Sequence, residues 1–311
     1  MKIYLVNTNF EQQIRNKNLI DKWCQNAKEI EYLFFYLQDG DYFSQANYDR
    51  NYLDRFPNVF VYNTNLENKK IHYLWGNLEL RKEKLQFSSK VKSHNFLKEL
   101  INSYYPNFDY KIVNSILNID KKKNVVRSEY GYSGVLEKTG QYIVTNRLHR
   151  TIDLSLYWKG NEKGIYQNYV SLNNRYFGTK INLELETTLI ENFLQGYELA
   201  DTEITRFLKF IDDLEKGYLS PFIANSELIT MDFFIYIDQS SENKIYPFCE
   251  FNTRMTMGIL AHKLNLNLSK SNQSYKNFLF LPRKISSSHQ IERTLSPENS
   301  KFIAGFSQQD L

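Results

Sequence analysis

Two carboxylates and an amide lie in a segment whose spacing brings them together, Met231 to Gly258. Asp232 is inside an apolar run, where an ionised carboxylate is costly unless it is paired or bound to metal. Glu250 and Asn252 lie two positions apart near the end of a second run, and strand alternation places them on one face. If the two runs form a hairpin, Asp232 lies beside that pair and completes an oxygen site suited to Mg²⁺. The alternative is a polar hairpin end with solvated carboxylates.

The same segment resembles the last metal-binding strands of the ATP-grasp superfamily, in which an acid in a D-F-hydrophobic strand is followed by a turn and E-x-N-x-R. The resemblance implies that Asp232, Glu250 and Asn252 are Mg²⁺ ligands. It also implies that Arg254 is the catalytic arginine that faces the substrate carboxylate and the acyl phosphate made from it. The following Thr-Met-Gly is similar to that of small bacterial members.

The resemblance requires nucleotide-binding residues earlier in the chain. Lys90, at the start of a predicted helix, matches the phosphate-contacting lysine, although such a lysine is more often a solvated surface charge. Arg127 stands where the family usually has lysine, and arginine keeps the charge but not the shape. Gly131, Ser133 and Gly134 suit the phosphate-closing loop, although the same residues also make an ordinary turn.

The expected adenine hinge, and the strand that follows it, carry three further candidate residues. The family often has an acid there to hold the ribose, whereas this chain has only Leu148 to pack on adenine. Arg150 and Asp153 are candidates for substrate binding, and a strand-end ion pair between them is the equally weighted alternative.

The resemblance implies an ATP- and Mg²⁺-dependent ligase (Mn²⁺ is an acceptable substitute). It activates a carboxylate as an acyl phosphate, releases ADP and forms an amide or peptide bond with an amine. The alternative is a degenerate ATP-grasp protein that binds nucleotide or a protein partner without catalysis. We expect a small acid, amino acid or peptide as substrate and neither nucleic acid nor membrane as partner. Many ATP-grasp ligases are dimers, so the resemblance also allows a homodimer.

Composition is consistent with this reading. The chain has 311 residues and a formal net charge of +4, too small for its length to indicate nucleic-acid binding. Cys24 and Cys249 are far apart, which excludes a disulfide scaffold and a zinc-finger-like site. The start of the sequence turns polar too soon for a secretory signal, and no apolar run has membrane-spanning length, so we expect a cytoplasmic protein.

The predicted helices and strands that carry these residues indicate an α/β (α+β) chain, and the resemblance implies the ATP-grasp fold. We expect an N-terminal α/β subdomain at 1–87, a central lid subdomain at 88–150, a C-terminal mixed-sheet subdomain at 151–270 and an extension at 271–311. Periodicity predicts strands at 2–7, 31–38, 58–62, 111–117, 141–145, 153–158, 164–172, 228–237 and 244–252. It predicts helices at 11–28, at 90–103 with a Ser cap, at 188–216 ended by Gly217, and at 259–266.

Overall fold

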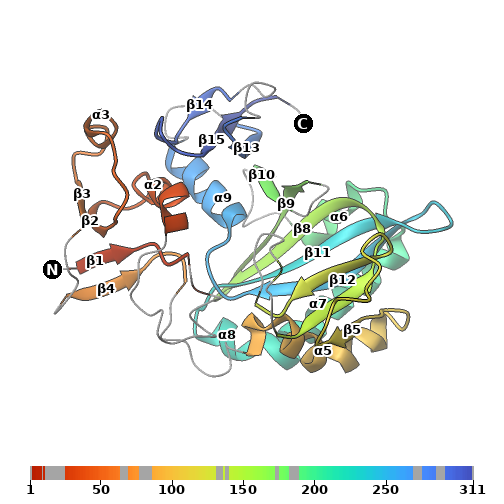
Figure 1. Cartoon of the computed structure of the whole chain (residues 1–311). Helices are drawn as coiled ribbons and strands as arrows, with labels where there is room; N and C mark the ends of the chain where they lie inside the picture. The colour runs from red at the N-terminus through yellow and green to blue at the C-terminus, as the bar shows by residue number, and fades with distance from the viewer. Residues whose placement is uncertain are drawn as a thin grey trace. The chain divides into compact units, whose positions relative to one another are not determined.

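The computed structural model has two compact units, and its helices and strands are drawn in Figure 1. The structure describes residues 2–8, 10, 25–63, 69–76, 86–130, 136, 140–171, 175–181, 189–268, 275–284 and 291–309. Unit 1 comprises residues 1–79, 177–183 and 254–311, and unit 2 comprises 80–176 and 184–253. Parallel and antiparallel sheets occur together with helices, which confirms the expected α/β class. The four-part division of the chain stays a prediction.

Unit 1 begins with a small parallel sheet. Its strands run in the order β3-β2-β1-β4, and all are parallel. Their bounds are β1 Lys2–Leu5, β2 Gly40–Phe43, β3 Val59–Tyr62 and β4 Lys70–Tyr73. Within residues 25–63 the structure has short helical segments at η2 (Gln25–Glu29), α2 (Glu31–Phe34) and α3 (Arg50–Leu53).

The predicted strand at 31–38 is wrong, because this segment begins as helix α2. All four residues of α2 are buried, and a run that is apolar on every side has no period that separates a buried strand from a buried helix. The Glu31 carboxylate inside it accepts hydrogen bonds from the hydroxyls of Ser44 and Tyr48. The predicted helix at 11–28 lies mostly outside the described residues.

The C-terminal part of the chain completes unit 1. Helix α9 (Met257–Leu268) is followed by β13, β14 and β15, which form antiparallel pairs with one another and with the earlier strand β10, in the order β10-β13-β15-β14. These are β10 Tyr176–Lys180, β13 Asn277–Pro282, β14 Arg293–Thr294 and β15 Phe302–Ser307. The Tyr36 and Tyr52 hydroxyls both donate to the Leu295 carbonyl oxygen, at 3.1 and 2.7 Å. The first and last parts of the sequence therefore build one core.

Unit 2 contains a four-stranded run of antiparallel strands in the order β12-β11-β8-β9 and a separate three-stranded sheet in the order β5-β7-β6. The strands are β5 Lys111–Val113, β6 Asn124–Ser128, β7 Tyr142–Asn146, β8 His149–Lys159, β9 Glu162–Val170, β11 Ile229–Ile237 and β12 Asn243–Asn252. The helical segments are α5 Lys90–Tyr104, α6 Ile190–Gln195, α7 Asp201–Leu214, η3 Glu215–Leu219 and α8 Ser220–Ala224. Figure 1 shows α5 and α7 on one face of the larger sheet.

The apolar stripe of α7 covers that face. The Phe207 ring lies 4.7 Å from the Phe233 ring of β11, and Leu154 and Met231 belong to the same buried cluster. The prediction that Gly217 ends the helical segment is wrong, because a π-helical turn carries the chain through it into α8. Burial of Leu219 and the residues around it outweighs the cost of one helical glycine, about 1 kcal/mol.

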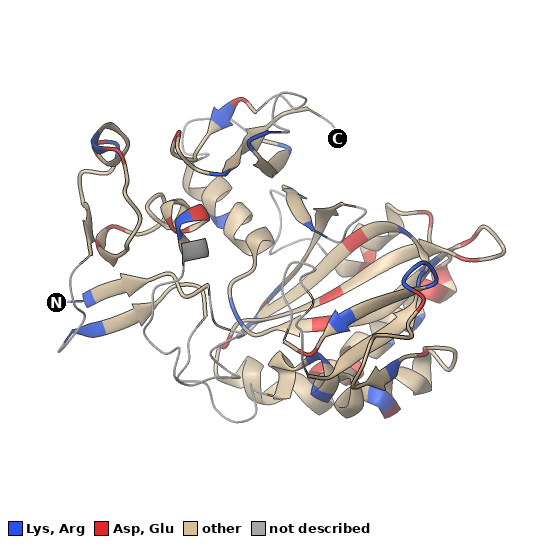
Figure 2. Ribbon diagram, viewed as in Figure 1, with Lys and Arg blue, Asp and Glu red and all other residues tan. Residues whose placement is uncertain are grey.

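Charge is distributed over both units. Figure 2 shows lysine and arginine interspersed with aspartate and glutamate along the ribbon. None of the described helices is long and apolar enough to cross a membrane.

Candidate nucleotide and carboxylate site

One face of the larger sheet in unit 2 carries the predicted acidic residues. Asp232 of β11 is paired across the ladder with Glu250 of β12 on one side and Ser155 of β8 on the other. Directly paired residues share a face, and so does Asn252, two positions beyond Glu250. The opposite face is apolar and packs on the helices. Strand alternation, once one face is committed to the core, therefore places the three predicted metal ligands together.

Hydrogen bonds hold the Asp232 carboxylate in place. Ser155 Oγ donates to Oδ1 at 2.6 Å, and Asn252 Nδ2 donates to Oδ2 at 2.9 Å. Asn168 of β9 orients the serine by donating to its Oγ at 2.8 Å. The chain of contacts fixes the amide of Asn252 with its nitrogen toward Asp232, and its carbonyl oxygen remains an acceptor for a ligand.

Lys90 and Glu250 meet at the end of helix α5. Lys90 is the first residue of the helix, and the Ser89 side chain caps it by accepting from Lys92 N at 3.1 Å. The Lys90 backbone N–H donates to the Glu129 carbonyl oxygen just beyond β6. These two constraints leave the lysine side chain buried, and its Nζ lies 3.0 Å from Glu250 Oε2. Lys90 is therefore not a solvated surface charge.

Arg127 is a half-buried arginine, and two of its guanidinium nitrogens are out of reach of solvent. It lies on β6, and its Nη1 donates to the carbonyl oxygen of Cys249 at 2.9 Å. Its Nε and Nη2 are inaccessible to solvent and make no hydrogen bond of good geometry within the described residues, although the Tyr246 hydroxyl and the Cys249 thiol lie close enough to interact with the guanidinium. Burial by itself lowers the pKa of Arg127, but Cys249, Tyr246 and Glu250 outweigh it and hold the pKa above its ordinary value. The side chain stays charged, and its orphaned N–H groups fit an oxyanion.

An apolar patch adjoins this cation. Phe234 and Tyr246 stack with ring centroids 4.5 Å apart and planes inclined by 8°, and Cys249 completes the buried group. Leu148, in the connection between β7 and β8, packs against it. The two rings are themselves buried, so Leu148, which is half-buried, is the member of this group that a nucleotide base could contact.

The pair Arg150 and Asp153 is joined by an ion pair, the second of the two alternatives weighed from the sequence. The Arg150 guanidinium also lies over the Phe234 ring, 4.9 Å from its centroid. Burial lowers the pKa of Arg150. Both residues are thus in the neighbourhood of the site, and their part in substrate binding stays a prediction.

Arg254 belongs to unit 1 and the other predicted residues to unit 2. Its Nη1 donates to the Met255 carbonyl oxygen at 3.0 Å, and its guanidinium lies over the Trp75 ring. The loop residues Gly131, Ser133 and Gly134 lie outside the described residues.

Sequence reasoning missed Ser155, Asn168 and His94. Ser155 could have been found, because it lies two residues after Asp153 and so on the same face of a predicted strand. His94 lies one helical turn after Lys90, and its Nδ1 donates to the Lys90 carbonyl oxygen at 2.7 Å. Its Nε2 is buried and has no partner in the described chain. Burial, together with the Arg127 charge, holds the pKa of His94 well below its usual range, so the ring is neutral.

The donor set of the site fits Mg²⁺. Within the described residues no three His, Cys, Asp or Glu side chains form a group that could hold a metal by themselves. Asp232 and Glu250 supply two carboxylates and Asn252 an amide oxygen, and Mg²⁺ is commonly held by one or two carboxylates together with water and substrate phosphates. The assignment of these three residues as ligands stays a prediction.

No family model and no curated protein matches the chain. The fold is similar to that of N5-carboxyaminoimidazole synthetase from Staphylococcus aureus, with 10% identity over 99% of this chain and 94% of that one and a TM-score of 0.48. It is also similar to D-alanyl-alanine synthetase A from Vibrio cholerae O1 biovar eltor, with 13% identity, 86% and 93% coverage and a TM-score of 0.39. A third is D-alanine–D-alanine ligase from Bacillus anthracis complexed with ATP, with 12% identity, 87% and 96% coverage and a TM-score of 0.32.

These proteins are ATP-grasp ligases.

Proposed function

We propose that this chain is a cytoplasmic, ATP- and Mg²⁺-dependent ligase that activates a small carboxylate as an acyl phosphate and transfers the acyl group to an amine, releasing ADP. The substrate class is a small acid, an amino acid or a peptide. The proposal rests on the residues of the site in unit 2 and on the sequence motifs that they form.

The observation that carries it is the buried guanidinium of Arg127. Leaving a buried polar group unsatisfied costs about 1–3 kcal/mol, and more for a charged group. Arg127 has two such nitrogens, and it is bonded to the carbonyl of the residue before Glu250. A phosphate group of a nucleotide would satisfy both nitrogens in the bidentate manner that arginine favours.

The neighbouring residues suit the rest of Mg-ATP. Lys90 would neutralise a second phosphate oxygen, because its Nζ is held at the same carboxylate edge. Asp232, Glu250 and Asn252 would hold Mg²⁺, which neutralises the phosphates when bound. Leu148, backed by the buried stacked pair of Phe234 and Tyr246, would contact the base.

Phosphoryl transfer requires positioning and charge neutralisation and no protein nucleophile. This requirement matches the composition of the site, in which Cys249 is buried and burial raises its pKa to about 11. In this scheme Arg254 would hold the attacking carboxylate.

The test is a thermal melt with and without Mg-ATP on the wild type, on Glu250→Gln and on a matched control, Glu242→Gln. Glu242 is an exposed carboxylate just before β12, paired with Lys244, so it is in the same unit but away from the site. A ligand at a hundred times its Kd stabilises a protein by about 2.7 kcal/mol. We expect the wild type and Glu242→Gln to show the full shift, and Glu250→Gln a reduced one.

A second measurement identifies the reaction. The wild type is incubated with Mg-ATP and a pool of amino acids and small dicarboxylic acids, and nucleotide products are separated. Acid-dependent ADP and phosphate support the proposal, whereas AMP and pyrophosphate contradict the acyl-phosphate route. Binding of Mg-ATP with no turnover for any pool would favour a nucleotide-binding protein without catalysis.

A further inference from the structure

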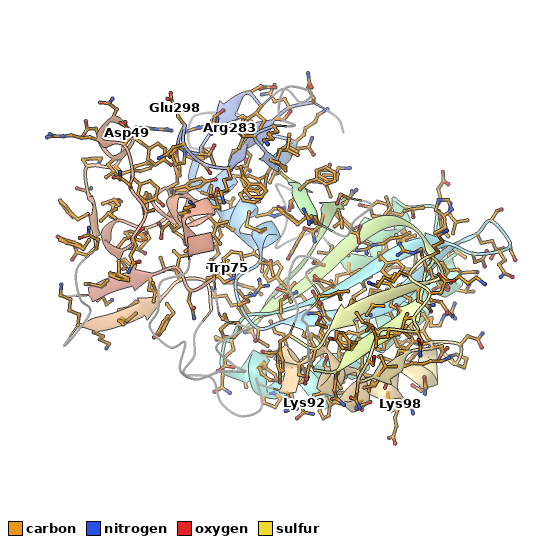
Figure 3. All side chains as sticks on the ribbon, viewed as in Figure 1. Asp49, Trp75, Lys92, Lys98, Arg283 and Glu298 are labelled. Carbon is orange, nitrogen blue, oxygen red and sulfur yellow. The ribbon has the colours of Figure 1, made fainter. Side chains whose placement is uncertain are left out.

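In unit 1 a tryptophan lies under the arginine assigned to the substrate carboxylate. The Arg254 Cζ atom is 5.1 Å from the centroid of the Trp75 ring, within the range of a cation–π contact. Trp75 follows β4 and is labelled in Figure 3. No sequence motif pointed to it.

The same two segments are also joined through the backbone. The Met255 N–H donates to the Trp75 carbonyl oxygen at 2.9 Å, and Arg254 Nη1 donates to the Met255 carbonyl oxygen at 3.0 Å. The guanidinium therefore has two contacts that hold it. One is the Trp75 ring, and the other is the carbonyl oxygen of Met255, a residue whose own N–H is hydrogen-bonded to Trp75. The rotation of a long side chain is restricted in this way, which lowers the entropy lost when it binds an anion.

The tryptophan itself is rigidly supported. It is buried, with 9% of its surface exposed, and the Phe34 ring meets it edge-on at 6.4 Å and 80°. The adjoining Gly76 has no room for a side chain, because a Cβ there would lie 2.4 Å from Phe10 Cγ. Asn7 Nδ2 fixes the Gly76 carbonyl oxygen at 3.0 Å. Trp75 is thus a fixed platform and not a mobile surface ring.

We propose that Trp75 is a positioning residue that holds the Arg254 guanidinium flat and ready for a substrate carboxylate. The proposal rests on the proposed function for the role of Arg254. Arginine recognises carboxylates through a planar fork, so fixing the plane of the guanidinium fixes the orientation of the bound acid. A misplacement of about 1 Å in such a group can lower the rate on the order of 100-fold.

The test compares Trp75→Leu, Trp75→Phe and a matched control, Phe34→Leu. The control removes an aromatic ring from the same core cluster and from the edge of Trp75, and leaves the ring under Arg254 in place. Phenylglyoxal modifies exposed guanidinium groups, and peptide mass spectrometry reports its rate at Arg254 alone. The rate is measured with and without the pool of amino acids and small dicarboxylic acids.

We expect slow modification of Arg254 in the wild type, with further protection by the acid pool. Phe34→Leu should raise the rate only slightly, because it loses the ring at the edge of Trp75 but keeps the ring under Arg254. Trp75→Leu should react several-fold faster and lose the protection, and Trp75→Phe should recover much of both. For an acid that supports ADP release, Trp75→Leu should lower kcat/KM for the acid by about 10- to 100-fold and leave KM for ATP unchanged.

Equal modification rates in Trp75→Leu and Phe34→Leu would overturn the positioning role, and so would a wild type that the acid pool does not protect. The Mg-ATP melt separates this failure from failure of the proposed function. A wild type with a nucleotide shift but no effect of Trp75 contradicts only the present proposal, and a wild type without a shift contradicts the proposed ligase.

Discussion

Replacing Arg127 by methionine should stabilise the ligand-free protein and at the same time abolish its response to nucleotide. Methionine fills a similar volume without charge. The change removes one hydrogen bond from a charged donor to the Cys249 carbonyl oxygen, worth about 1.5–3 kcal/mol, and two buried unsatisfied nitrogens that cost about 1–3 kcal/mol each. The difference favours the variant by about 1–2 kcal/mol in the free energy of unfolding.

The nucleotide response should change in the opposite direction. At a hundred times the wild-type Kd, Mg-ATP contributes about 2.7 kcal/mol to the wild type, and loss of a bidentate phosphate contact should reduce this below about 1 kcal/mol. Urea unfolding with and without Mg-ATP measures both quantities. Arg147→Met is the control, because Arg147 is exposed and donates to the Lys121 carbonyl oxygen on the neighbouring turn. It should change neither quantity by more than about 0.5 kcal/mol.

A destabilised Arg127→Met that keeps the full nucleotide increment would refute this reasoning. Arg127 would then be a structural cation whose orphaned nitrogens are satisfied by water. The nucleotide increment of Arg127→Lys should fall between those of the wild type and Arg127→Met, because lysine keeps the charge but loses the second donor.

Four further outcomes follow from the geometry. Lys90→Met should weaken ATP binding at least about tenfold by calorimetry, since Glu250 loses its partner and the phosphate its counter-charge. Chelation of Mg²⁺ should reduce the ATP-induced melting shift in the wild type but change it little in Glu250→Gln. Burial lowers the pKa of His262 to about 4, so the unfolded chain takes up a proton from about pH 6.5 downward while the folded unit does not. Unit 1 should therefore lose about 3 kcal/mol between pH 6.5 and 4, and urea unfolding of His262→Gln should show a smaller loss. Gly305→Ala should destabilise by about 1–3 kcal/mol in the same assay, because a Cβ there would lie 2.4 Å from the Arg293 carbonyl oxygen.

The elements that carry the site could be predicted from the sequence where burial is one-sided. Strands β11 and β12 alternate, so Asp232, Glu250 and Asn252 could be assigned to one face before the structure was known. The start of helix α5 could be predicted from Ser89, which is its N-cap residue in the structure. Segments buried on all sides gave no such signal, and the aromatic run that begins with Glu31 was misassigned for that reason.

The contacts that define the site could not be predicted in the same way. The ion pair of Lys90 with Glu250 and the bond of Arg127 to the Cys249 carbonyl oxygen join residues far apart in the sequence. The hydrogen bond of Arg127 to the Cys249 carbonyl oxygen also depends on an irregularity in β12. Asp232 is opposite Glu250, but Phe234 is opposite Tyr246, so β12 accommodates extra residues around its proline. No propensity rule places such a bulge.

The division of unit 1 between the two ends of the chain has a consequence for synthesis on the ribosome. Glu29 and Tyr52 find their partners at Ser300 and Leu295, so the N-terminal strands cannot complete their core when they emerge. At about 5–20 residues per second, they wait roughly 12–54 s for those partners to be translated. Unit 2, whose residues come almost entirely from the middle of the chain, can fold during that interval. The N-terminal strands are thus translated first but complete their core last.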